Sequence, residues 1–224
     1  AGRSFCTGAL IDDDLVLTAA HCLFDPRSGR RFEVDEIEFL ADWRGGRAAA
    51  YRGVRQAVAH PAFRYEADRD TARVEHDVAL LRLEHPIRNG AIQPFATRPR
   101  PPKGAAVGVV SYAQDRAETP ALQELCHVLA RQSDALVLSC DVDFGSSGAP
   151  VFVVEDGVPR IVSVVSAKAE IGGRKVALGP AIDAPLAEVR AALGPDPTEV
   201  RDTRGATGPI DGSRAATGAK FLRP

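Results

Sequence analysis

The chain has 224 residues, of which 45% are hydrophobic and 26% are charged, and its formal net charge is -2. Apolar content at this level can fill one large or two small cores. No apolar run approaches the ~18 residues needed to cross a membrane. The balanced charge, without a basic stripe, argues against nucleic acid or an anionic membrane as a partner.

Short apolar runs separated by turn residues fill the first half of the chain, a pattern typical of β-strands. We expect strands over residues 5–11, 14–18, 36–40, 51–58 and 78–83. Two of these strands adjoin a residue with catalytic chemistry. The second runs into His21, and Asp77 opens the last.

A second set of strands follows a proline-rich stretch, residues 97–104, which is too stiff to belong to either core. We expect these strands over residues 106–111, 122–128, 136–140, 150–154, 161–167 and 176–182. The sequence therefore predicts an all-β protein with two groups of strands.

A serine framed by glycines lies within Gly145-Ser-Ser-Gly-Ala-Pro150, directly before an apolar run. Glycine lets the backbone approach a substrate and point its N–H groups outward, where a Cβ would interfere. A serine hydroxyl becomes a nucleophile when an adjacent base takes its proton, and the base needs a third group to orient it. His21, Asp77 and Ser147 occur in the order histidine, aspartate, serine.

Residues 183–194 predict a helix that begins at Asp183 or Ala184 and stops at Gly194. We expect its apolar stripe to pack on the second group of strands rather than on a partner.

Residues 195–224 are rich in Gly, Pro, Thr, Arg and Asp and predict a disordered tail. Its Phe221-Leu222 pair could dock on a barrel or add to an exposed sheet edge.

Three strings resemble the chymotrypsin/trypsin-like serine peptidases of the secreted, bacterial type: Thr18-Ala-Ala-His21-Cys22, Asp77-Val-Ala-Leu80 and Gly145–Pro150. The resemblance covers roughly residues 4 to 185. It implies two six-stranded antiparallel β-barrels with a C-terminal helix and a flexible tail, divided as residues 1–98, 99–194 and 195–224. It implies neither a cofactor nor a metal.

The resemblance also implies a role for each site residue. His21 would be the general base, Asp77 would orient it, and Ser147 would attack the carbonyl, with the N–H groups of Gly145 and Ser147 as oxyanion hole. The implied function is a serine endopeptidase that acts on protein or peptide substrates through an acyl-enzyme. The alternatives are a non-catalytic binding protein on the same fold and an esterase that uses the same triad.

Four cysteines allow three pairings. Cys6–Cys22 and Cys126–Cys140 would each close a short loop, and the first matches the family bridge beside the histidine. Disulfides indicate a secreted or periplasmic protein. Zinc is the alternative, because His21 and His127 each adjoin a cysteine, but closely spaced Cys-x-x-Cys pairs are absent. The lack of methionine, even at position 1, favours removal of a signal peptide over a trimmed chain.

Two departures from the family pattern affect activation and fold. Ser146 replaces the aspartate that usually pairs with a new amino terminus, and Ala1 lies only five residues before Cys6. We therefore expect the oxyanion hole to be pre-formed by turn packing and by the Cys126–Cys140 bridge. The first barrel would also be short of one edge strand unless upstream residues or the tail supply it.

Specificity is expected to depend on Asp141, six residues before Ser147, where trypsin-like members carry the aspartate that selects Arg or Lys. It could equally be a turn residue, since the cysteine that usually follows is absent. Ser166 resembles the residue that lines the pocket, with Ser163 as its rival. The remaining histidines, His60, His76, His85 and His127, are expected to be surface or satisfied residues.

Overall fold

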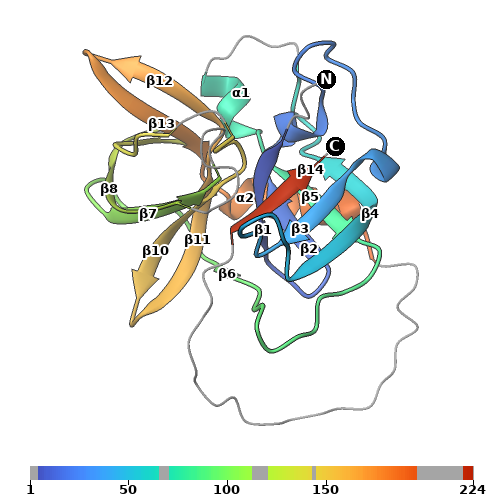
Figure 1. Cartoon of the computed structure of the whole chain (residues 1–224). Coiled ribbons are helices and arrows are strands. Elements are labelled where there is room, and N and C mark those ends of the chain that lie inside the picture. Colours follow the sequence, from blue (N-terminus) through green and yellow to red (C-terminus); the bar gives the residue numbers. More distant parts are fainter. Residues whose placement is uncertain (1–4, 66–70, 113–120, 143–144, 196–218, 224) are drawn as a thin grey trace.

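The chain folds into two groups of β-strands and a C-terminal helix, as the alternation of short apolar runs and turn residues predicts (Figure 1). The structure is a computed structural model that describes residues 5–65, 71–112, 121–142, 145–195 and 219–223. The all-β, two-barrel class with a C-terminal helix is confirmed. Among the described residues, no helix is long and apolar enough to span a membrane.

Six strands close the first barrel, in the order β1-β14-β3-β4-β5-β2. Buried side chains from β1, β2, β3, β4 and β5, such as Leu10, Val16, Phe39 and Leu81, fill its core. Its strands are β1 (Cys6–Leu10), β2 (Leu15–Thr18), β3 (Glu38–Ala41), β4 (Ala50–Ala59), β5 (Ala79–Leu83) and β14 (Ala219–Arg223).

The last strand of this barrel, β14, comes from the far end of the chain. Residues 219–223 are therefore not a disordered tail: they pair antiparallel with β1 on one side and β3 on the other. Of the two sources considered for the missing edge strand, the tail supplies it here. Residues 196–218, to which the rest of the tail prediction applies, lie outside the described residues.

The second group is an eight-stranded sheet in the order β12-β13-β9-β8-β7-β10-β11-β6, which curls around its own core (Figure 1). Two of its strands, β6 and β12, were not predicted, because β6 has only two residues and Ala167–Ile171 contains no apolar run. The strands are β6 (Ala96–Thr97), β7 (Ala106–Ser111), β8 (Ala121–Gln132), β9 (Ala135–Leu138), β10 (Pro150–Glu155), β11 (Val158–Val164), β12 (Ala167–Ile171) and β13 (Arg174–Pro180).

The C-terminal helix α2 (Asp183–Leu193) docks on the first barrel, which corrects the expectation that it packs on the second. Gln56 Nε2 donates to Leu193 O at 3.0 Å, and Arg82 Nη2 donates to Gly194 O at 3.0 Å. Donors from β4 and β5 thus satisfy carbonyls that a helix end leaves open. The residue that precedes the helix is Ile182, not Asp183 or Ala184. The other helices are short: η1 (Ala20–Leu23), η2 (Val34–Glu36) and α1 (Thr71–Glu75).

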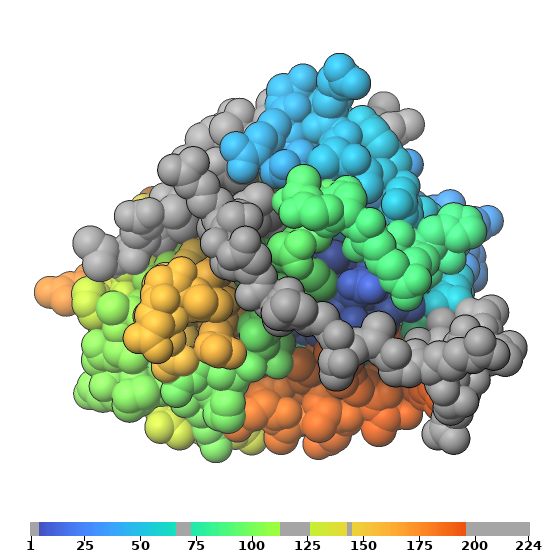
Figure 2. All heavy atoms as spheres, turned by 90° about the horizontal axis from the view of Figure 1, so that it is seen from below, coloured from blue at the N-terminus to red at the C-terminus, as the bar shows by residue number. Residues whose placement is uncertain are grey.

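The two groups of strands are joined by the segment after β5, which runs along the turn between β1 and β2. Ile87 N donates to Asp13 O and Phe95 N donates to Leu10 O, both at 2.8 Å. The space-filling view shows this green segment around the blue residues of the turn, with the orange surface of α2 alongside (Figure 2). A cluster of buried apolar residues from β1, β2, β5, β11 and α2 joins the first barrel to the second sheet.

Candidate active site

His21 and Asp77 meet at the end of the first barrel because the strands that carry them are neighbours. β2 and β5 are antiparallel, with Thr18 opposite Ala79, so His21 in η1 and Asp77 before β5 fall at the same edge. The Nδ1 atom of His21 lies 2.7 Å from Asp77 Oδ2, and the backbone N–H of His21 donates to Asp77 Oδ1 at 2.8 Å. Both carboxylate oxygens therefore bind the same residue.

Asp77 is only 1% exposed, yet its surroundings lower the pKa of its carboxyl group. Burial alone would raise the pKa of Asp77, because a carboxylate loses hydration inside the protein. The positive charge that His21 can carry and the hydrogen bonds from His21 and Ser166 act in the opposite direction and lower the pKa of Asp77 overall. The carboxylate can therefore orient the imidazole and stabilise its cationic form.

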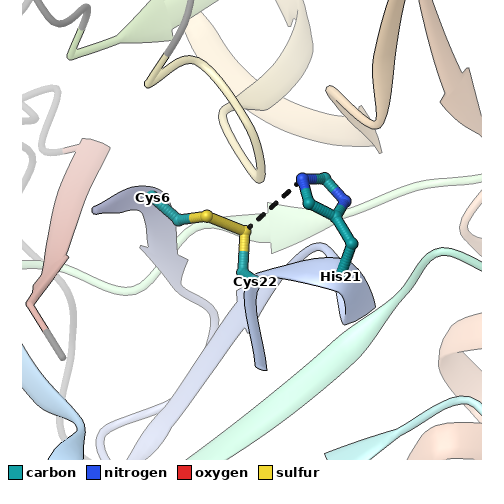
Figure 3. Close-up of side chains that lie close together, drawn as sticks. All are labelled: Cys6, His21 and Cys22. Atoms are coloured by element: carbon teal, nitrogen blue, oxygen red, sulfur yellow. Dashed lines mark hydrogen bonds between the residues drawn. A yellow bond between two sulfur atoms is a disulfide. The ribbon is translucent and has the colours of Figure 1, made fainter. Parts of the chain in front are cut away.

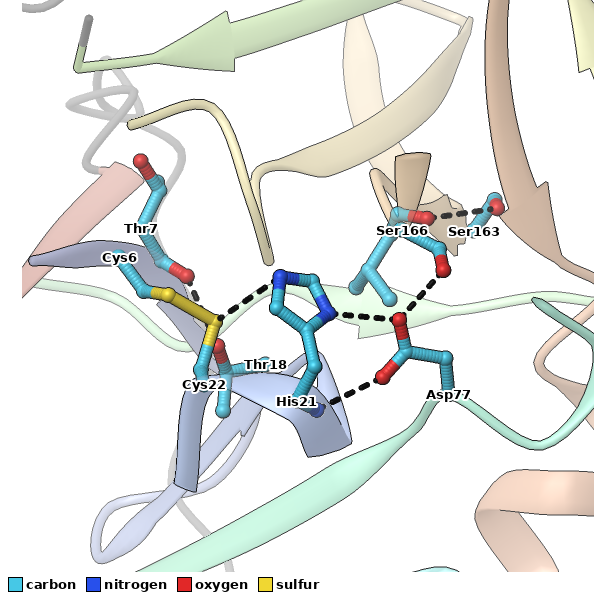
Figure 4. A network of polar contacts seen from close by, with 9 residues as sticks. Cys6, Thr7, Thr18, His21, Cys22, Asp77, Ser163 and Ser166 are labelled. Atoms are coloured by element: carbon cyan, nitrogen blue, oxygen red, sulfur yellow. Dashed lines mark hydrogen bonds and ion pairs between the residues drawn. A yellow bond between two sulfur atoms is a disulfide. The ribbon is translucent and has the colours of Figure 1, made fainter. Parts of the chain in front are cut away.

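The contact with Asp77 favours the tautomer of His21 that carries its proton on Nδ1. With Nδ1–H donating to the carboxylate, Nε2 of the neutral ring carries the free lone pair. Nε2 points away from Asp77 and lies 4.0 Å from Cys22 Sγ (Figure 4). In that tautomer, Nε2 is the ring nitrogen that can accept a proton.

The serine turn is shaped by two glycines with positive φ angles. Gly145 has φ 95° and Gly148 has φ 75°, backbone conformations that residues with a side chain rarely adopt. A Cβ on Gly148 would lie 2.2 Å from Thr18 Oγ1 and 2.3 Å from Thr7 O. The turn therefore lies directly against the two strands that precede His21. On its other side, Gly148 N donates to Val165 O at 2.7 Å.

Thr7 in β1 is a buried residue that sequence reasoning missed, and four hydrogen bonds converge on it. Its N–H donates to Ser147 O at 2.8 Å, and its Oγ1 donates to Gly145 O at 3.0 Å. Its Oγ1 also accepts from Tyr112 N at 3.3 Å, and its carbonyl accepts from Thr18 Oγ1 at 2.9 Å. No local motif indicates this role, because three of the four partners, Ser147, Gly145 and Tyr112, lie more than a hundred residues away.

Ser147 itself is half-buried on this turn. Within the described part of the chain, no hydrogen bond joins its Oγ to His21, and none uses the backbone N–H of Gly145 or of Ser147. The structure thus brings His21 and Asp77 into contact and places the Ser147 turn beside them without a bond between the two. Asp143 and Phe144, which precede the turn, lie outside the described residues.

The residues predicted for specificity lie in different surroundings. Ser166 Oγ donates to Asp77 Oδ2, so its side chain acts on the carboxylate (Figure 4). Ser163 is fully buried and donates to Pro180 O at 2.6 Å. Asp141 is on the surface, with its side chain 61% exposed and one oxygen 3.9 Å from Lys175 Nζ.

The cysteines form the two short-loop disulfides, Cys6–Cys22 and Cys126–Cys140. The first lies beside the imidazole of His21, and these three side chains bring potential metal-binding atoms within 4.8 Å of one another (Figure 3). Zinc binds cysteine as the thiolate, which a sulfur bonded to another sulfur cannot supply. The group therefore does not fit zinc.

The other histidines lie outside this network. His60 is buried and stacks on His76 with ring centroids 4.7 Å apart. Its Nδ1 accepts from Ala62 N, and its Nε2 lies 3.1 Å from Glu188 Oε2 on α2. Burial first, and then the neighbouring His76, lower the pKa of His60. His85 and His127 are exposed.

Two β-domains that bring a buried histidine–aspartate pair next to a glycine-framed serine define the class of chymotrypsin-like proteins. The family model of the trypsin-like peptidase domain matches residues 6–159, more than half of the chain. The chain belongs to this trypsin-like peptidase family.

Curated relatives are similar at modest identity. The chain is 29% identical over 123 residues to human mannan-binding lectin serine protease 1, covering 49% of this chain and 17% of that protein. It is 33% identical over 87 residues to trypsin theta of Drosophila erecta, covering 39% of this chain and 29% of that protein. The chain thus spans less than a third of the length of either relative.

Proposed function

We propose that the chain is a serine endopeptidase that hydrolyses protein or peptide substrates through an acyl-enzyme on Ser147. The observation that carries this proposal is the Asp77 carboxylate, which is bonded to both the N–H and the Nδ1 of His21. A histidine held in this way presents Nε2 as a base, which is what a serine nucleophile requires.

In the proposed reaction, Nε2 of His21 takes the proton of Ser147 Oγ as that oxygen bonds to the substrate carbonyl carbon. The imidazolium then gives the proton to the leaving amine. Water attacks the acyl-enzyme with His21 again as the base. Hydrogen bonds between nucleophile and base are often long without substrate and shorten when it binds. The lack of a hydrogen bond between Ser147 Oγ and His21 among the described residues agrees with this.

The backbone N–H groups of Gly145 and Ser147 are the proposed oxyanion hole. They are uncommitted among the described residues, whereas Thr7 holds the carbonyl oxygens of the same two residues. Fixing these carbonyls fixes the peptide planes next to the N–H groups. Donors set in advance toward the developing negative charge are a large contribution in acyl transfer.

Cleavage after Arg or Lys is the finer part of the proposal, with Asp141 as the selecting carboxylate. Its exposed side chain and its long contact with Lys175 leave it accessible to a substrate cation. Turnover of peptides that differ only in that side chain, compared between the unchanged protein and Asp141→Asn, tests this point. Equal rates for Arg, Lys and Leu peptides would contradict it.

A secreted or periplasmic location is proposed from the two disulfides, which persist in oxidising compartments. Mass determination of the protein isolated from its native source, with and without reduction and alkylation, checks that the bridges form there.

Digestion of casein, followed by mass spectrometry of the products, tests the endopeptidase proposal. We expect internal cleavage by the unchanged protein and none by Ser147→Ala, which keeps both turn glycines and is expected to fold. Hydrolysis of activated esters without any peptide cleavage would show an esterase instead. Inactivity on both, in a folded protein, would favour a binding protein.

A further inference from the structure

The strand β14 pairs with β1, the strand whose Thr7 binds the serine turn. It lies between β1 and β3, with Cys6 opposite Leu222 and Phe221 opposite both Thr7 and Leu40. Every other strand of this barrel comes from the first 83 residues. Residues from beyond the second sheet therefore complete the first barrel.

The two edges of β1 serve different partners. In an antiparallel strand, the N–H and C=O of one residue point to one side, and those of the next residue point to the other. The N–H of Thr7 donates to Ser147 O, so the serine turn binds the edge of β1 that β2 leaves free after Thr18. The backbone groups of Cys6 and Gly8 then face the opposite edge, where β14 lies.

The single strand β1 thus separates β14 on one edge from the serine turn on the other. Thr7 packs tightly against the serine turn. Its carbonyl oxygen would lie 2.3 Å from a Cβ added to Gly148, and its hydroxyl donates to Gly145 O. Loss of β14 would leave Cys6 and Gly8 without their strand partners. Unpaired edge groups seek water or new partners, which shifts the strand. A shift of β1 would move Ser147 and Gly145 together.

Resting on the proposed function, we propose that β14 is a positioning strand for Ser147 and that residues 219–223 of the same chain are its occupant. Binding an extended segment between two strands is β-strand addition, which uses main-chain bonds. The Cys6–Cys22 disulfide fastens the start of β1 next to His21. The gap between β1 and β3 can therefore lose β14 and accept it again without release of β1.

The test compares the full chain with a variant that ends at residue 218, using the rate at which a fluorophosphonate labels the serine. A displacement of about 1 Å at a reacting group can reduce a rate about 100-fold, so we expect a loss of that order. A synthetic peptide of residues 219–224 should restore the rate in a saturable way, and a scrambled peptide should not. Labelling of the shortened chain at the same measurable rate as the full chain would overturn the proposal.

A second pair of variants keeps the test decisive if the shortened chain does not fold. Lys220 lies opposite Gly8, so Lys220→Pro removes an N–H from the ladder, while Lys220→Ala retains it. We expect slow labelling of the first and full-rate labelling of the second. Equal and measurable rates in both would overturn the proposal. A dimer on size-exclusion chromatography, in which each copy gives its β14 to the other, would overturn it as well.

Hydrogen exchange separates this proposal from the proposed function. The N–H of Thr7, which is bonded to Ser147 O, should exchange faster in the shortened chain and recover protection with the peptide. This outcome supports the role of β14 even if the full chain is never labelled, in which case only the peptidase proposal fails. Unchanged protection of Thr7 would overturn the role of β14.

Discussion

His21 and Asp77 belong to the first barrel and Ser147 to the turn before β10, and these two parts of the site are fixed by different forces. The first part is fixed by side-chain hydrogen bonds around a buried charge, with Asp77 bound by His21 and Ser166. The second part is fixed by backbone bonds and by the absence of side chains at Gly145 and Gly148. The first part should therefore respond to changes of charge, and the second to changes of shape.

The largest effect is expected from a change of charge at Asp77. Asp77→Asn keeps the shape but removes the charge that fixes the tautomer of His21, and turnover should fall by about 10⁴-fold, the order found for such triads. Steady-state hydrolysis of an uncharged peptide measures it. Asp35→Asn removes the same charge at an exposed site outside the proposed machinery and should leave that rate unchanged. Near-normal turnover by Asp77→Asn would refute the role given to the carboxylate.

A change of shape at Gly148 should break the second part of the site. Gly157 is the matched control, because its φ of 78° is close to that of Gly148 at 75° but no atom lies within 4 Å of its Cβ position. Gly157→Ala should cost about 1–2 kcal/mol for the left-handed backbone alone. Gly148→Ala adds the collision with Thr18 and Thr7, so its loss in denaturant unfolding should be larger. Equal losses would show that the close approach is unimportant.

Thr7 sharpens the comparison, because its hydroxyl links the turn to β1 without touching the histidine. Thr7→Val keeps the volume but removes the hydroxyl that donates to Gly145 O and accepts from Tyr112 N, at a cost of about 1–3 kcal/mol. We expect kcat to fall more than KM rises, and Thr7→Ser to recover kcat. A loss of stability with unchanged kcat would show that Thr7 has a structural role alone.

The smallest expected effect is a pH dependence of stability from His60, away from both parts of the site. Because the pKa of His60 is lowered in the fold, the unfolded chain binds its proton more readily. Stability from this group is complete above the unfolded pKa of about 6.5 and is lost as pH falls through the folded value. The facing groups are His76 and, from α2, Glu188.

Urea unfolding between about pH 5 and 7 isolates this contribution. His60→Asn, whose side-chain oxygen can accept the Ala62 N–H, should show a shallower loss of stability across this window. His85→Asn, at an exposed histidine, should retain the full loss. The lowered pKa of Asp77 acts at lower pH, since a carboxylate loses its contribution only as pH falls below about 4.

The parts of the fold and of the site that could be predicted from the sequence are those encoded by short local segments. Most of the strands are encoded locally by apolar runs and turn residues. The strings around His21, Asp77 and Ser147 are also local, so their resemblance to a family pattern could be seen in the sequence. Thr7 was missed because its function arises from partners more than a hundred residues away, such as Gly145. The docking of α2 was assigned to the wrong half for the same reason, since Arg82 on β5 binds its end.

The source of the sixth strand could be stated only as a choice between upstream residues and the tail. Its few residues, Ala219–Arg223, become a strand because β1 and β3 provide two open ladders, and not because the segment itself is strongly patterned. Likewise β12 has no buried residue and alternates apolar with charged side chains, and its pairing with β13 defines it. Pairing between distant segments, rather than local preference, decides these parts of the fold.

Fluorophosphonate labelling tests the central claim most directly, because the reagent bonds only to a serine that a base activates. We predict one adduct by intact mass, mapped to Ser147 by peptide analysis and absent from a folded His21→Ala variant. A folded, disulfide-bonded protein that remains unlabelled, or that is labelled equally without His21, would contradict the account.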